Sequence, residues 1–100
     1  MNMEENLKAY SKQVTEALQA LDWSKVELLA QVLEKAKAAR RHVFVCGNGG
    51  SAATAAHFVT DLNAVAKGFR AVDLTSCSPW MTCIANDNSY AYVFVDQIHP

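Results

Sequence analysis

The sequence CGNGGSAATAAHF, residues 46–58, places three glycines, an asparagine and a serine between an apolar run and an alanine-rich segment. The run before it, HVFVC at residues 42–46, is rich in valine and aromatic residues, which predicts a strand buried on both faces. The segment after it predicts a helix from about Ser51 to Ala66, with Gly68 as its C-terminal cap. Strand, glycine loop and helix in this order begin a parallel α/β sheet.

A glycine loop at this place in the chain can bind an anion. Its backbone N–H groups converge at the end of a strand, and the helix that follows adds the positive end of its dipole. Glycine permits positive φ, expected here at Gly50, and lets a ligand approach the backbone closely. Ser51 can cap the helix or donate its hydroxyl to the anion. The loop also fits an ordinary turn, because GNGGS is neither GxGxxG nor a lysine-containing P-loop.

Two pairs of polar residues follow the loop. His57 and Asp61 are four residues apart in the predicted helix and therefore share one face. They can supply half of a divalent-metal site, act as a proton-transfer pair, or form a plain surface hydrogen bond. Asn86 and Asp87, taken alone, predict only a polar turn.

The remaining segments predict four further elements and one ambiguous segment. Two amphipathic helices precede the strand, the first with apolar positions at Leu7, Tyr10, Val14, Leu18 and Leu21, and together they predict a helical hairpin over residues 1–40. Asp22 or Ser24 can cap the second helix. AVDLTS, residues 71–76, predicts a second strand, and SPWMTCIAND, residues 78–87, a short helix with Pro79 in its first turn. By propensity alone, YAYVFVDQI at residues 90–98 is a strand.

Composition limits the class of protein. The 100 residues, 51% hydrophobic and 19% charged, suit one small globular domain. The net charge of −1 argues against direct nucleic-acid binding, although Arg40, Arg41 and His42 form a local basic group. The polar, acidic N-terminus and the absence of a long apolar run predict a cytoplasmic protein without a membrane partner. The three cysteines, without CxxC spacing, are expected to be free and buried.

The segments CGNGGSAATAAHFVTDL and CIANDNSYAYVFVDQI together resemble the sugar isomerase (SIS) domain family. Within it the chain is most similar to the phosphoheptose isomerases, which interconvert sedoheptulose 7-phosphate and a heptose 7-phosphate. The resemblance covers essentially residues 1–100, but only the first half of a typical member. It implies an SIS-type α/β fold, in which a parallel sheet is flanked by helices. Residues 41–100 would start the α/β sandwich, after the N-terminal hairpin.

The resemblance also implies roles for individual residues. Asn48, Gly49 and Gly50 would contact a phosphorylated sugar, with Ser51 close to its phosphate. His57 would be a zinc ligand, and Asp61 would bind the metal and act as the catalytic acid and base. Residues that would hold sugar hydroxyls are Asn86 and Asp87. The family further implies that residues 90–98 are helical and that the protein is a homo-oligomer, most often a homotetramer built from the N-terminal helices.

The chain departs from the family pattern in ways that leave two functions open. Asp61 stands where the enzymes carry glutamate, which retracts the carboxylate by one methylene. The connection from Asp61 to the second strand is short, with only Lys67 and Arg70 basic, and the second phosphate loop and the distal Gln and His ligands lie outside the chain. The chain is then part of a metal-assisted aldose–ketose isomerase, or of a non-catalytic SIS module that binds a sugar phosphate or a protein partner.

Overall fold

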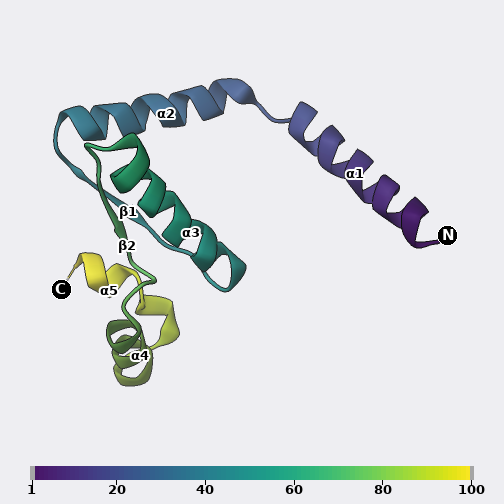
Figure 1. The fold of residues 1–100 in the computed structure, drawn as a ribbon. Helices are drawn as coiled ribbons and strands as arrows, with labels where there is room; N and C mark the ends of the chain where they lie inside the picture. The colour runs from purple at the N-terminus through teal and green to yellow at the C-terminus, as the bar shows by residue number, and fades with distance from the viewer. Residues whose placement is uncertain (1, 100) are drawn as a thin grey trace. The chain divides into compact units, whose positions relative to one another are not determined.

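The structure, a computed structural model, describes residues 2–99 as helices and a two-stranded parallel sheet (Figure 1). The chain divides into two units, Met1–Gln31 and Val32–Pro100, and each is described by itself. The elements in chain order are α1 (Met3–Gln19), α2 (Trp23–Ala38), β1 (His42–Val45), α3 (Gly50–Thr60), η1 (Asp61–Ala66), β2 (Arg70–Asp73), α4 (Ser78–Asp87), η2 (Tyr90–Tyr92) and α5 (Val95–Ile98).

Both predicted N-terminal helices are present. α1 begins with a capping box, in which Glu5 N donates to Asn2 Oδ1 at 2.9 Å and Asn2 N donates to Glu5 Oε2 at 3.1 Å. α2 begins after Asp22, whose Oδ1 accepts from Ser24 N at 3.1 Å, and the hydrogen bond from the Ser24 side chain lowers the pKa of Asp22. The elements are therefore confirmed, whereas their pairing as a hairpin stays a prediction.

The two predicted strands pair in parallel. Their register joins His42 to Arg70 and Val45 to Asp73. α3 lies alongside both strands (Figure 1) and packs against them, and Ala71 of β2 is only 8% exposed. Alternate side chains of the sheet are exposed to solvent, to 47% for Phe44 and 37% for Val72. The expectation that the first strand is buried on both faces is wrong for this structure, because its side chains alternate between a partly covered face and an exposed one.

The long helix after the loop has the predicted extent but changes its winding. It is α-helical over α3 and π-helical over η1, a change that sequence periodicity does not predict. In η1, Asn63 Nδ2 donates to the carbonyl of Ala71 at 3.0 Å, and Ala71 N donates to Asn63 Oδ1 at 3.0 Å. One side-chain amide thus satisfies both backbone groups of a β2 residue. Lys67 (φ 63°) caps the helix, and the predicted cap, Gly68 (φ 80°), follows it.

The C-terminal segment is helical. α4 carries Pro79 in its first turn, as predicted. Residues 90–98 form η2 and α5, so the strand expected from propensity is wrong and the helix implied by the resemblance is confirmed. Val93 between them is 1% exposed, and Gln97 Nε2 donates to the carbonyls of Leu74 and Val93 at 2.8 and 2.7 Å. These contacts attach the segment to the end of β2.

Cys46, Cys77 and Cys83 are free, as expected, but all three are exposed. The expectation that they are buried is wrong, because Cys46 follows the end of β1, Cys77 precedes α4, and Cys83 faces the polar Asp87. Between residues 2 and 99, no helix combines the length and the apolar character that a membrane crossing requires.

Candidate functional site

The glycine loop lies at the carboxyl end of β1, where it enters α3. Gly49 is the N-cap residue, with φ 60° and ψ −121°, a backbone conformation that side chains other than glycine rarely adopt. Gly50 begins the helix and has no positive φ, so the expectation of positive φ at Gly50 is wrong and Gly49 takes that conformation instead. A Cβ added at Gly50 would have no other atom within 4 Å and would point into open space.

Hydrogen bonds within the loop determine which N–H groups can receive a ligand. Asn48 N donates to Ser51 Oγ at 2.7 Å, Ser51 N donates to the Asn48 carbonyl at 3.2 Å, and Ala52 N donates to the Gly49 carbonyl at 3.1 Å. Among residues 2–99, the N–H groups of Gly49 and Gly50 are the loop donors that have no partner. Two adjacent N–H groups without a partner at the start of an 11-residue helix can donate hydrogen bonds to an anion.

Ser51 stabilises the loop itself. Its hydroxyl donates to the Asn48 carbonyl at 2.9 Å and accepts from Asn48 N, which closes a local ring between the loop and the first turn of α3. The structure therefore places Ser51 beside Gly49 and Gly50, as the sequence predicts, with its hydroxyl bonded to the loop. Its contact with a phosphate stays a prediction.

Two residues that support the loop escaped the sequence analysis. A Cβ at Gly47 would overlap the carbonyl of Ser51 and lie 2.6 Å from Ala52 N, so only glycine permits this approach of β1 to α3. Thr75, just beyond β2, contacts Gly47 through its hydroxyl. Gly47 could have been identified as part of the glycine cluster, whereas nothing local in the sequence marks Thr75.

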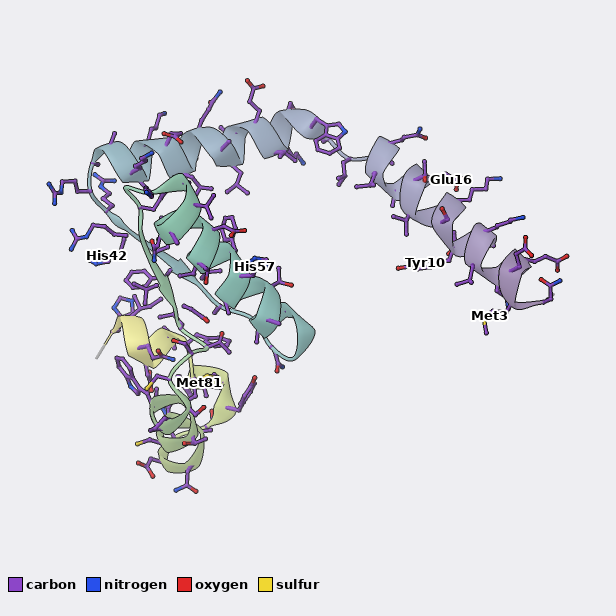
Figure 2. All side chains as sticks on the ribbon, viewed as in Figure 1. Met3, Tyr10, Glu16, His42, His57 and Met81 are labelled. Carbon is purple, nitrogen blue, oxygen red and sulfur yellow. The ribbon has the colours of Figure 1, made fainter. Side chains whose placement is uncertain are left out.

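His57 and Asp61 lie one turn apart, as predicted, and His57 projects from α3 (Figure 2). His57 Nε2 is 3.6 Å from Asp61 Oδ1, and the side chains are 79% and 55% exposed. Both residues line an open hollow along α3 and the start of η1, together with Ala53, Thr54 and Phe58. The pair can present one imidazole nitrogen and one carboxylate to the same ligand. Among residues 2–99, no third His, Cys, Asp or Glu joins them in a metal-binding group.

Asn86 and Asp87 end α4, and their bonds in the structure are local. Asn86 Nδ2 donates to Asp87 Oδ1 at 3.1 Å, and Cys83 Sγ donates to Asp87 Oδ2 at 3.2 Å. The hydrogen bond and the negative charge of Asp87 raise the pKa of the Cys83 thiol, so the thiol stays protonated as a donor. Within the described part of the chain, no hydrogen bond joins Asn86 or Asp87 to the glycine loop. Their role toward sugar hydroxyls stays a prediction.

Comparison with known proteins identifies the family of the chain. The model of the SIS domain family matches residues 7–99. The chain belongs to the SIS domain family. It is similar to a phosphoheptose isomerase of Helicobacter pylori (strain P12), with 36% identity over 91 residues, which are 87% of this chain and 45% of the relative. With a phosphoheptose isomerase of Alkalilimnicola ehrlichii it shares 43% identity over 75 residues, 71% of this chain and 36% of the relative.

The solved structures include one with the same fold. Phosphoheptose isomerase GmhA from Neisseria gonorrhoeae superposes with a TM-score of 0.83 at 30% sequence identity, over 98% of this chain and 54% of that chain. The parallel α/β architecture predicted from the sequence is thereby confirmed as the SIS-domain fold. The chain spans about half the length of the relatives that it matches.

Proposed function

We propose that this SIS-domain chain contributes the phosphosugar-binding loop of an aldose–ketose isomerase that acts on a phosphorylated heptose. The observation that carries the proposal is the pair of free N–H groups of Gly49 and Gly50 at the start of α3. A phosphate is the ligand that such a site favours, because it accepts hydrogen bonds from both groups and carries negative charge toward the positive end of the helix dipole. The similarity to phosphoheptose isomerases supports a sugar 7-phosphate as the carrier of that phosphate.

The exposed pair of His57 on α3 and Asp61 at the start of η1 carries the groups that an isomerisation needs. In an aldose–ketose interconversion, a base takes the proton from the hydroxyl-bearing carbon next to the carbonyl, which leaves an enediolate. A proton is then delivered to the former carbonyl carbon, and the hydroxyl proton passes to the former carbonyl oxygen, so that the other carbon becomes the new carbonyl. Asp61 is the proposed base, because its carboxylate is exposed and one helical turn from His57. After it accepts the proton, Asp61 is the acid that returns it. Asn48 and the residues Asn86 and Asp87 are proposed to hold the sugar.

Zinc is the metal that we propose for the intact protein, with His57 and Asp61 as two of its ligands. An imidazole nitrogen and a carboxylate oxygen on one face of a helix are donors that suit zinc. A catalytic zinc normally has three protein ligands, and residues 2–99 supply two in one place. When bound, the metal would polarise the sugar oxygens. We expect the 100-residue chain alone to hold no metal tightly and to catalyse nothing.

We further propose that the protein is cytoplasmic and a homotetramer, and the apolar positions of α1 support the tetramer. Side chains that recur every three or four residues on α1 are exposed, namely those of Leu7, Tyr10, Val14 and Leu18. A helix face of this kind is suited to packing against a helix of another subunit. The oligomeric state is measurable by light scattering, and a monomer at micromolar concentration would contradict the tetramer.

Turnover by the intact native protein that contains this chain tests the proposal. We expect it to convert sedoheptulose 7-phosphate to the heptose 7-phosphate. We also expect inorganic phosphate to compete with the substrate, because both use the donors of Gly49 and Gly50. Binding of the sugar phosphate without any turnover would favour the second candidate function, a non-catalytic SIS module. That candidate is also favoured by the aspartate at position 61, where the family carries glutamate. Neither binding nor turnover would contradict both.

A further inference from the structure

The glycine loop is attached to the neighbouring strand through one hydroxyl group. Thr75 Oγ1 accepts a hydrogen bond from Gly47 N at 3.1 Å and donates to the carbonyl of the same residue at 3.2 Å. The two residues are 28 positions apart in the sequence, and the contact is partly buried. One side chain therefore satisfies both backbone groups of the residue that immediately precedes the loop.

Thr75 is itself held in place from several directions. Its N–H donates to Asp73 Oδ1 at 2.8 Å, and the N–H of the preceding Leu74 donates to the Val45 carbonyl at 2.9 Å. Leu74 is 4% exposed, and its carbonyl accepts from Gln97 Nε2 at 2.8 Å. The hydroxyl thus extends from a backbone whose position is determined by β1, β2 and α5.

The contact acts at the point where the loop would otherwise be free to move. On the α3 side, Ser51 bonds to Asn48 and closes the loop upon itself. On the strand side, β1 ends at Val45, and the bonds from Thr75 to Gly47 continue the connection to β2 beyond that end. Gly49 and Gly50, whose N–H groups have no partner in the described part of the chain, lie between these two attachments.

We propose that Thr75 is a positioning residue of the phosphosugar site, which it serves by holding Gly47 so that the Gly49 and Gly50 N–H groups are oriented before the ligand arrives. The inference rests on the proposed function, since the ligand is the sugar phosphate. Ligand binding to a preorganised loop does not have to offset the ordering of that loop. Loss of the Thr75 hydroxyl should therefore weaken binding more than it slows the chemical step.

The test compares three variants of the intact native protein. Thr75→Val keeps the size and branching of the side chain but removes both hydrogen bonds to Gly47, whereas Thr75→Ser keeps the hydroxyl. Thr15→Val is the matched control on α1, where the threonine hydroxyl bonds only to its own helix. With sedoheptulose 7-phosphate, we expect Thr75→Val to raise KM about tenfold, with kcat changed less than about threefold. Thr75→Ser and Thr15→Val should stay near the wild type.

Hydrogen exchange adds a readout that does not depend on turnover. The amides of Gly47 and Asn48, which donate to Thr75 Oγ1 and Ser51 Oγ, should exchange faster in Thr75→Val than in Thr75→Ser, with no change in α1. A lower kcat at unchanged KM, or equal exchange in the two variants, would overturn the inference and leave Thr75 a residue of general stability. A wild-type protein that binds no sugar phosphate would overturn the proposed function and this inference with it, whereas normal binding by Thr75→Val would overturn this inference alone.

Discussion

Replacement of Asn63 by alanine should destabilise the protein through the loss of two specific hydrogen bonds. The Asn63 amide bonds to both backbone groups of Ala71 at 3.0 Å, and Ala71 is 8% exposed, so water replaces the lost partner poorly. A backbone group left unsatisfied in a buried place costs about 1–3 kcal/mol. Because the contact is partly buried, we expect Asn63→Ala to lower the free energy of unfolding by about 2–4 kcal/mol in total.

Asn63→Asp tests the donor half of the contact. Aspartate can still accept from Ala71 N, but it cannot donate to the Ala71 carbonyl and sets a charged oxygen against it, so this variant should also destabilise the protein. Asn6→Ala, on an exposed position of α1, is the control and should stay within about 0.5 kcal/mol of the wild type.

Urea denaturation followed by circular dichroism measures these differences, at one protein concentration because subunit association affects the midpoint. Hydrogen exchange of the Ala71 amide gives the local counterpart, and its protection should fall in Asn63→Ala. The reasoning is refuted if Asn63→Ala unfolds at the same urea concentration as Asn6→Ala, or if the Ala71 amide keeps its protection.

Three further predictions concern His57 of α3 and Asp61 of η1. His57→Ala should remove zinc from the intact protein without unfolding it, since the imidazole is 79% exposed. Mass spectrometry measures the zinc content, and a variant that retains zinc contradicts the assignment of His57 as a ligand. Asp61→Asn should keep the fold and lower kcat about 10²–10⁴-fold, because an amide cannot exchange a proton at neutral pH. Asp61→Glu distinguishes two interpretations of this position. A slower enzyme indicates that aspartate is the working base, whereas a faster enzyme indicates that the shorter aspartate side chain impairs catalysis relative to the glutamate of the family.

The order of elements was predictable because local patterns carry it. Amphipathic spacing predicted α1 and α2, and the glycine cluster between an apolar run and an alanine-rich segment predicted β1, the loop and α3. Propensity failed at residues 90–98, where the burial of Val93 and the bonds of Gln97 stabilise helical turns that valine and tyrosine do not favour by themselves.

The parts of the site that escaped prediction depend on contacts between distant residues. His57 and Asp61 could be paired from their spacing, since both lie on one helix. Thr75 could not be connected to Gly47, because the contact arises only when β1 and β2 pair in parallel and end at the same edge. The π-helical winding of η1 and the bonds from Asn63 to Ala71 likewise depend on the return of the chain to β2.

Calorimetric titration of the intact native protein with sedoheptulose 7-phosphate, in the wild type and in Gly50→Val, tests the central claim most directly. Gly50 has no positive φ, and a Cβ there meets no protein atom within 4 Å, so the valine side chain would extend into the space proposed for the ligand and leave the loop unstrained. Circular dichroism should confirm that the variant is folded. We predict saturable binding by the wild type and none detectable in Gly50→Val, whereas equal affinity in the two proteins would contradict phosphosugar binding at this loop.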